Sequence, residues 1–250
     1  VYAKMRVPPV LKKSAEVGSI QKFWVIVDDD AGGTKSEEVV AEMLAKGDHT
    51  AIWADTSKLS SANNISSSLA NQYITLLEEK TPSGSRDSTK GIYDLLLTYF
   101  GNVPNKDGDG IVDYVFADLP SGVGGYFSPL DQTDQIGSNK RDILYIDVFM
   151  SDEYSKSVIA HEAQHLIHSN YTNKGLKFNE GLSEMAIIIS GYGDAGVSFS
   201  RYLNNVGKVG WEWESESVHY DMAALFVLYF TEQLGDESLK IFQNINASGF

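Results

Sequence analysis

The N-terminal part of the chain contains short apolar runs that are followed by an aspartate. Residues 23–27 and 50–54 are rich in β-branched and aromatic side chains and are each followed by aspartate. Such runs are typical of buried strands. Residues 111–117 and 142–148 also alternate or cluster apolar side chains. The pattern therefore predicts a sheet built from these four runs.

Apolar residues at helical spacing predict helices elsewhere. Residues 62–79 and 89–100 show this spacing, with serines at 66–68 and 88 as polar starts. Strands early and helices late indicate an α+β fold rather than a regular α/β alternation. We expect an N-terminal α/β subdomain with the sheet in residues 1–150 and a mainly helical subdomain in residues 151–250. The helices expected after residue 151 are 152–169, 179–190, 199–205, 220–234 and 237–244.

Composition and charge narrow the chemistry that the chain can support. Its 250 residues are 42% hydrophobic, which is enough to bury a full core. A net charge of −14 disfavours binding to nucleic acid or to an anionic membrane surface. No run approaches the roughly 18 consecutive apolar residues of a membrane span. The chain has no cysteine, so a transition metal would rest on histidine and carboxylate ligands.

His161, Glu162 and His165 form an H-E-x-x-H motif within a run that is free of proline and glycine. On a helix, residues i and i+4 share one face, so both imidazoles can reach one tetrahedral Zn²⁺ ion. Glu162 then lies beside the metal, where it can act as a general base. The alternative is an amphipathic helix whose histidines only cap a core. The motif and its helical context predict a zinc site.

A catalytic zinc ion needs a third protein ligand and an open position for water. Glu180 is the candidate ligand, because the polar segment 169–175 can return a second helix antiparallel to the first. Glu184, one turn later, can accept the free N–H of a ligating histidine, with His161 as the preferred partner. A solvated helix face is the alternative for both glutamates. His168 is a rival third ligand, but it would stand about 10.5 Å along the helix axis from His161.

These two motifs carry a family resemblance. H-E-x-x-H followed by N-E-G-x-S-E at residues 179–184 resembles the gluzincin metallopeptidases, in which two histidines and a downstream glutamate hold zinc. Residues 178–185 and the Gly-Gly-Tyr-Phe-Ser-Pro segment at 124–129 look most like hyicolysin-type bacterial secreted neutral metallopeptidases. The resemblance covers about residues 105–235. It implies a zincin-like fold, with the mixed sheet packed on the active-site helix, and a secreted or cell-surface location in bacteria.

The site residues and the resemblance together predict a zinc-dependent endopeptidase that acts on protein or peptide substrates. A metal-activated water would attack the peptide bond, and Glu162 would take its proton. The developing oxyanion needs a second donor besides zinc. Tyr220 is the candidate, because related gluzincins carry a tyrosine at a similar helix start; a core aromatic is the alternative. The substrate backbone would add as a strand near residues 122–127.

A second cation site is expected in an acidic loop at residues 105–113. Oxygen ligands at alternate positions suit Ca²⁺, and Gly110 stands at the sharp turn of an EF-hand-type loop. Phe116 replaces the glutamate of the twelfth position, so the loop is not an EF-hand. A plain Asp/Gly turn is the alternative. The expected ligands are Asn105, Asp107, Asp109, the main-chain carbonyl of Ile111, and Asp113.

Two other functions remain open. An aminopeptidase of the same clan would need acidic groups that hold a free α-amine, and no distinct motif for them is visible. A non-catalytic surface-binding module on a peptidase-like scaffold would use zinc only structurally. Structural zinc sites usually have four protein ligands, and the intact Glu162 also speaks against this reading. The oligomeric state is not predicted.

Overall fold

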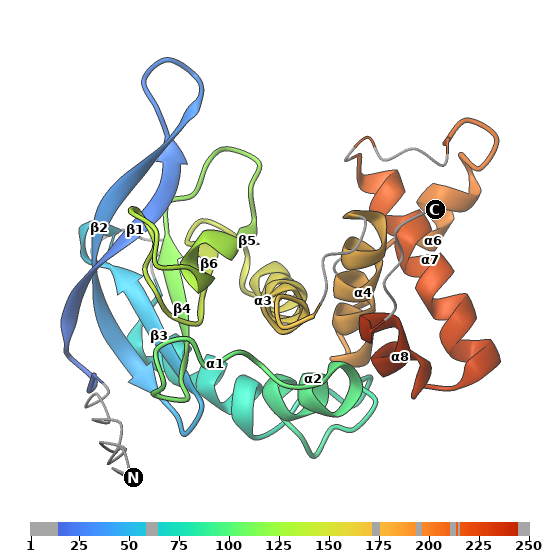
Figure 1. Cartoon of the computed structure of the whole chain (residues 1–250), viewed down its shortest axis with the longest axis horizontal. Coiled ribbons are helices and arrows are strands. Elements are labelled where there is room, and N and C mark those ends of the chain that lie inside the picture. Colours follow the sequence, from blue (N-terminus) through green and yellow to red (C-terminus); the bar gives the residue numbers. More distant parts are fainter. Residues whose placement is uncertain are drawn as a thin grey trace, which may run out of the picture.

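The computed structural model describes residues 15–58, 65–171, 176–193, 197–210, 214 and 216–244. Within these ranges the protein has the predicted α+β composition. A six-stranded mixed sheet occupies one side of the molecule and a group of helices the other, with helix α3 (Asp152–His168) between them (Figure 1).

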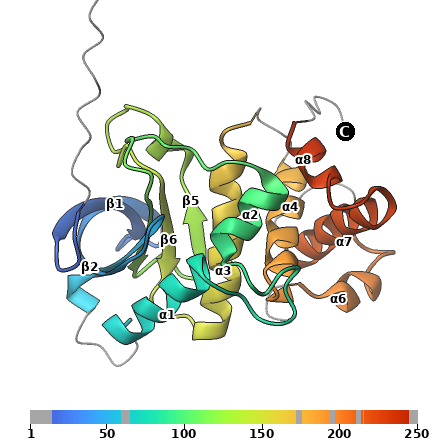
Figure 2. The ribbon, with the colours of Figure 1, turned by 90° about the horizontal axis from the view of Figure 1, so that it is seen from below.

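The sheet has the strand order β1-β2-β3-β4-β6-β5. Strands β3, β4 and β6 run parallel, while β1, β2 and β5 are joined antiparallel. The sheet is strongly curled (Figure 2), and the hydroxyl of Tyr126 on β5 accepts a hydrogen bond from the Ile26 N–H on β1 at 2.8 Å. Strand bounds are β1 Ile20–Asp28, β2 Thr34–Lys46, β3 Thr50–Asp55, β4 Val112–Ala117, β5 Gly125–Phe127 and β6 Ile143–Asp147.

Strand β2 is an element that the hydrophobic pattern does not predict. Its first half, beginning at Thr34, is polar and exposed, and it pairs with β1 as a solvent-facing ribbon, with Trp24 opposite Glu38. Its second half buries Met43 and Ala45 around a register shift. A strand that is polar at one end and irregular at the other lacks the alternation by which strands are recognised.

Two hydrophobic cores lie on opposite faces of the sheet. Neighbouring residues of β4 alternate between them: Val115 belongs to the core inside the curl, whereas Tyr114 and Phe116 belong to the larger core. The larger core also contains Ile159 of α3 and Leu182 of α4. Helix α3 is therefore held between the sheet and the helices that follow. The division into subdomains at residue 150 stays a prediction.

The helices begin close to where the sequence places them. The side chain of Ser66 caps α1 by accepting a hydrogen bond from the Leu69 N–H, and Gly91, rather than Ser88, precedes α2. None of the described helices is both long and apolar enough to cross a membrane. The remaining bounds are α1 Ser67–Glu78, α2 Ile92–Phe100, α4 Leu176–Ile189, α6 Phe199–Leu203, α7 Ser217–Leu234 and α8 Ser238–Asn244.

Candidate metal centre

Helix α3 presents the H-E-x-x-H motif from a firmly anchored position. The side chain of Ser151 caps its N-terminus, and Asp152 and Glu153 in the first turn complement the positive end of the helix dipole. Apolar residues of the helix enter the larger core. The histidines of the motif consequently project on one fixed face, as the i, i+4 spacing predicts.

Helix α4 faces α3 and is itself packed closely against α7. Gly181 makes this approach possible, because a Cβ atom there would stand 2.8 Å from the Ala223 carbonyl oxygen and 2.9 Å from a methyl group of Val227. The glycine of the N-E-G segment thus brings α7, which carries Tyr220, next to the helix that carries Glu180.

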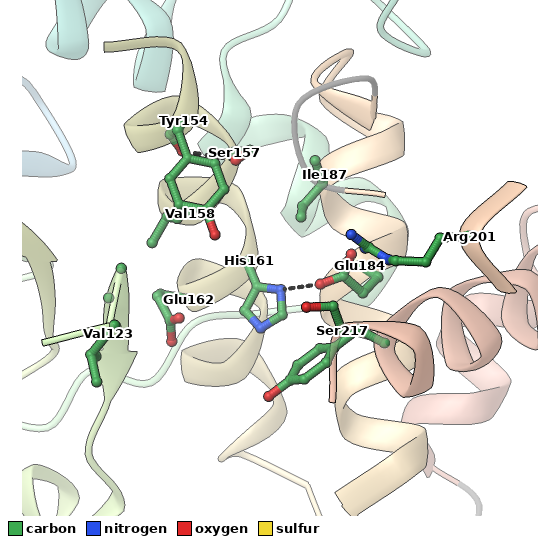
Figure 3. Close-up of a pocket in the computed structure, with 14 residues that line it drawn as sticks. Val123, Tyr154, Ser157, Val158, His161, Glu162, Glu184, Ile187, Arg201 and Ser217 are labelled. Carbon is green, nitrogen blue, oxygen red and sulfur yellow. Dashed lines mark hydrogen bonds and ion pairs between the residues drawn. The ribbon is translucent and has the colours of Figure 1, made fainter. Parts of the chain in front are cut away.

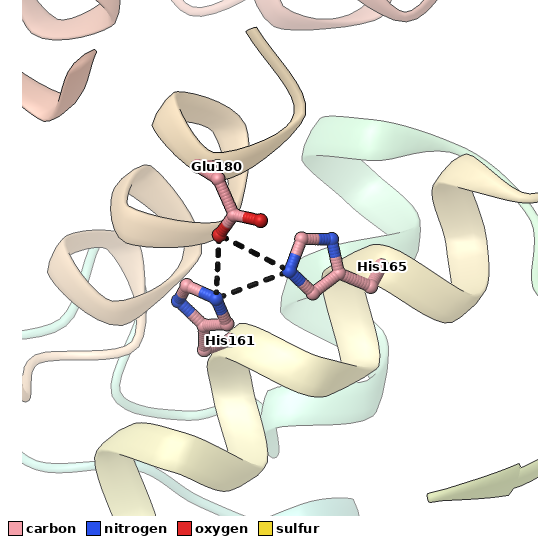
Figure 4. Close-up of side chains that lie close together, drawn as sticks. All are labelled: His161, His165 and Glu180. Carbon is pink, nitrogen blue, oxygen red and sulfur yellow. Dashed lines mark hydrogen bonds and ion pairs between the residues drawn. The ribbon is translucent and has the colours of Figure 1, made fainter. Parts of the chain in front are cut away.

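Three side chains from these two helices converge on one point (Figure 4). The Nε2 atoms of His161 and His165 are 3.1 Å apart. The Oε2 atom of Glu180 lies 3.2 Å from the first and 3.4 Å from the second. All three side chains are largely buried. The structure therefore brings the three predicted zinc ligands together.

The spacing of these atoms fits a tetrahedral ion. Ligands that stand about 2.0–2.1 Å from a tetrahedral zinc ion lie roughly 3.3–3.4 Å from one another. The three measured separations lie close to this range. Two imidazoles and one carboxylate are also a donor set that catalytic zinc sites use. The residues present thus fit a zinc ion with one position left for solvent.

Electrostatics favour a positive charge at this point. Burial lowers the pKa of His161, but hydrogen bonds to Glu180 and Glu184 outweigh it and raise the pKa to about 10. Burial alone would raise the pKa of Glu180, but the hydrogen bonds and charges of His161 and His165 outweigh that effect and lower the pKa to about 2. The buried carboxylates thus stabilise a cation between them, as a metal site requires.

Each histidine has a partner on its outer nitrogen. Nδ1 of His161 lies 3.1 Å from Oε1 of Glu184 (Figure 3), which agrees with the predicted pairing. Nδ1 of His165 lies 3.1 Å from the hydroxyl of Ser183, a contact that the sequence reasoning missed. Ser183 is three residues after Glu180 and so shares its helical face; that spacing was the available signal.

His168, the rival third ligand, does not join the three converging side chains. It is buried. Its distance along α3 from His161 is the physical reason, because seven residues place it almost two turns, about 10.5 Å, from His161.

Glu162 lies on the opposite side of His161 from Glu184 (Figure 3). Burial raises the pKa of its carboxyl group, against the opposing effects of His161 and His165. The main-chain N–H of Phe127 donates a hydrogen bond to it. Strand β5 can come this close because residue 125 is glycine: a Cβ there would stand 2.5 Å from Val158 and 2.8 Å from the Tyr145 carbonyl oxygen.

A cavity of about 520 Å³ opens in front of His161 and Glu162 (Figure 3). Tyr220 lines it from α7, and burial, reinforced by Glu180 and Glu184, raises its pKa to about 12. Its phenol therefore keeps its proton and can donate a hydrogen bond. Arg201 of α6 also lines the cavity and is fixed by Asp221, with 2.8 Å between Nη2 and Oδ1. The sequence reasoning did not single out Arg201, because no motif surrounds it.

The predicted calcium loop does not gather its carboxylates into a comparable cluster. Among the residues that the structure describes, His161, His165 and Glu180 are the one group of three or more acidic or histidine side chains with converging ligand atoms. Oδ1 of Asp113 accepts the Trp53 indole N–H at 2.6 Å, and its Oδ2 accepts from Arg141 at 2.8 Å. The structure therefore gives calcium no support.

Two more of the expected calcium ligands, Asn105 and Asp109, accept hydrogen bonds from main-chain N–H groups of the loop. The side chain of Asn105 accepts the Gly110 N–H at 3.1 Å, and Asp109 accepts the Ile111 N–H at 2.9 Å. Both contacts stabilise the Asp/Gly turn that was the alternative reading. These two hydrogen bonds fix the conformation of the acidic loop, residues 105–113, in which Asp107 Oδ1 is buried without a hydrogen-bond partner among the described residues.

Comparison with known proteins gives a partial similarity. The chain is similar to the neutral metalloprotease ShpI of Staphylococcus hyicus, with 28% identity over an alignment that covers 54% of this chain and 31% of that protein. The aligned region thus spans less than a third of that relative's length. No family profile matches the chain. This chain is therefore a distant relative, over part of its length, of a protein named as a neutral metalloprotease.

Proposed function

We propose that this chain is a zinc-dependent endopeptidase with a zincin-like arrangement of sheet, metal-bearing helix and ligand-bearing second helix. The observation that carries the proposal is the convergence of His161 Nε2, His165 Nε2 and Glu180 Oε2 beside the buried carboxyl group of Glu162. The partial similarity to a neutral metalloprotease supports the same class of chemistry. The proposed location is extracellular, on the basis of the family resemblance.

The zinc ligands, Glu162 and Tyr220 would each have a separate role in peptide hydrolysis. A zinc ion held by the three ligands supplies Lewis acidity, which makes water nucleophilic near neutral pH. Glu162 is the proposed general base, which takes a proton from that water and delivers it to the leaving nitrogen. Its raised pKa suits this exchange, because it brings the carboxyl group nearer to the working pH. Tyr220 is the proposed donor to the developing oxyanion.

Strand β5 offers a place for the substrate backbone. It is the terminal strand of the sheet, paired on one side with β6, and Gly124 and Gly125 line the cavity. A peptide added along this edge would be read through its main chain, with pockets for alternate side chains. The proposed substrate is therefore an extended segment of a protein or peptide.

The lining of the cavity favours an endopeptidase over an aminopeptidase. Among the described residues that line it, the carboxylates are Glu162 and Glu184. The first is the proposed base, and the second lies within 3.1 Å of the His161 ring. No further carboxylate of that lining is left to bind a free α-amine, which an aminopeptidase must recognise.

The test measures zinc and hydrolysis in the same preparations. Wild-type protein should bind an equimolar amount of zinc and cleave an internally quenched peptide faster than an aminoacyl chromogenic substrate. Glu162→Gln should keep its zinc and lose about 10²- to 10⁴-fold in rate, the range for removal of a general base. Glu153→Gln, an exposed substitution on the same helix, is the control and should match wild type.

Two outcomes would contradict the proposal. A Glu162→Gln variant that cleaves at the wild-type rate would remove the assigned base. A zinc-loaded wild type that cleaves neither substrate would favour the surface-binding module on a peptidase-like scaffold.

A further inference from the structure

Ser183 of α4 and Gln164 of α3 stand behind His165 in the buried interface between the two helices. Both side chains are fully buried. The Ser183 hydroxyl lies 2.6 Å from Oε1 of Gln164 and 3.1 Å from Nδ1 of His165. It also lies 3.2 Å from the main-chain oxygen of Asn179, one turn earlier in α4. One hydroxyl group thus connects the H-E-x-x-H helix to the glutamate-bearing helix.

With the Gln164 amide oriented as in the structure, its oxygen toward Ser183, the chemistry of these atoms sets the direction of the hydrogen bonds. A serine hydroxyl carries a single hydrogen, and an amide oxygen can only accept. The shortest contact therefore has Ser183 donating to Gln164 Oε1. Ser183 then accepts the hydrogen of His165 Nδ1, which leaves the lone pair of Nε2 directed at the ligand cluster. The reverse polarity would place the ring hydrogen on Nε2, where it would prevent ligation.

We propose that Gln164 and Ser183 form a neutral relay that sets the tautomer and orientation of His165 for metal binding. The inference rests on the proposed function, and it adds two positioning residues to it. Glu180, Ser183 and Glu184 follow one another at i, i+3 and i+4, so one face of α4 supplies a ligand, the relay and the partner of His161.

The two ligating histidines are supported differently. His161 faces the carboxylate of Glu184, whereas His165 faces a hydroxyl backed by an amide. A carboxylate partner adds negative charge and makes the imidazole a stronger donor, while a neutral partner orients the ring without adding charge. With Glu162, Glu180 and Glu184 already beside the centre, a neutral partner for His165 avoids a fourth buried carboxylate there.

The substitution Ser183→Ala tests the relay, with Ser190→Ala as its matched control. Ser190 is also fully buried, and its hydroxyl has no hydrogen-bond partner within the part of the chain that the structure describes. The two variants therefore lose the same atom from similarly packed positions. Zinc dissociation constants are measured by competition with a chromophoric chelator. Ser183→Ala should bind zinc about 10- to 100-fold more weakly than wild type, the range for partners of metal ligands, and Ser190→Ala should match wild type.

A double-mutant cycle separates a relay from two independent packing effects. Gln164→Met removes the amide oxygen but fills a similar volume. In the wild-type background it should weaken zinc binding by a smaller factor than Ser183→Ala, because Ser183 can still donate to Asn179. In the Ser183→Ala background it should have no further effect. The visible spectrum of the Co²⁺-substituted protein should change in Ser183→Ala and not in Ser190→Ala.

The outcomes are distinguishable from failure of the proposed function. Wild type that binds no zinc would overturn both. Wild type that binds zinc, with Ser183→Ala binding as tightly as Ser190→Ala, would overturn the relay alone. Equal effects of Gln164→Met in the two backgrounds would also overturn it. If Ser183→Ala does not fold, the comparison of Gln164→Met with Ser190→Ala decides, and equal zinc affinities would reject the relay.

Discussion

Two regions have the residue spacing of a cation site: the metal centre on α3 and α4, and the acidic loop at residues 105–113. Their ligand atoms are arranged differently in the structure. At the centre, His161, His165 and Glu180 direct their ligand atoms at one another. In the loop, Asp113 is held by Trp53 and Arg141. Ligand spacing alone does not distinguish the two.

The difference lies in which ligand atoms already form hydrogen bonds with neighbouring residues. At the centre, Glu184 and Ser183 contact the outer nitrogens of the histidines, so the inner nitrogens face the point where Glu180 joins them. In the loop, both carboxylate oxygens of Asp113, which calcium would need, accept hydrogen bonds from Trp53 and Arg141. A carboxylate that accepts hydrogen bonds at both oxygens, one of them from a guanidinium, has fewer lone pairs left for a cation. The following predictions test this distinction.

The largest expected effect is on zinc affinity. Glu180→Gln removes the charged ligand and should weaken zinc binding by more than about 100-fold, beyond the range for outer partners. Asp113→Asn should leave it unchanged. Chelator competition measures both. Equal losses in the two variants would show that the loop contributes to the same metal site.

A smaller effect is expected on the catalytic rate when Tyr220, which lines the cavity, loses its hydroxyl group. Tyr220→Phe should lower kcat about 10²-fold, at the lower end for loss of one oxyanion donor, and leave the zinc dissociation constant unchanged. Tyr229→Phe, an exposed change on the same helix, is the control. Steady-state kinetics with a quenched peptide measures it. If Tyr220→Phe loses zinc, Tyr220 would instead be a residue that maintains the structure of the zinc site.

Metal addition compares the two regions by thermal unfolding. Zinc at 100 times its dissociation constant should stabilise the protein by about 2.7 kcal/mol, or roughly 5–10 °C in Tm for a chain of this size. Calcium should shift Tm by less than about 1 °C. Calorimetry of the chelator-treated protein measures both. A calcium shift as large as the zinc shift would restore the loop as a metal site.

The smallest effect is a pH dependence that originates in the loop. Burial raises the pKa of Asp113 to about 6, despite Arg141 and Trp53. The carboxyl group of Asp113 therefore binds its proton more tightly in the folded protein than in the unfolded chain. The associated stability is fully present below about pH 4 and is lost as pH rises through about 6, with a change of about 2 kcal/mol between pH 4.5 and 7.5.

Asp113→Asn should remove this pH dependence, since its amide cannot ionise. The difference in unfolding free energy between variant and wild type should then change by about 2 kcal/mol between pH 4.5 and 7.5. Denaturant titrations at several pH values measure it. Asp94→Asn, an exposed change on α2, is the control. A constant difference across this range would mean that Asp113 is not the titrating group.

Local spacing predicted the elements that carry the centre. The helix expected at 152–169 is present as α3, and the one expected at 179–190 begins three residues earlier, as α4. Strand β2 was missed because half of it faces solvent. The contact of Ser183 with His165 was missed because it joins two helices whose register no local pattern specifies.

Local chain geometry was enough to predict which side chains share a helical face, because the 3.6-residue period places His161 with His165 and Glu180 with Glu184. The sequence also limited any transition metal to histidine and carboxylate ligands, because the chain has no cysteine. The folded arrangement was needed to show that the two faces meet, that β5 passes Glu162, and that Asp113 is held by Trp53 and Arg141. These outcomes depend on how elements pack and which donors they bring, and packing joins residues that are distant in the chain.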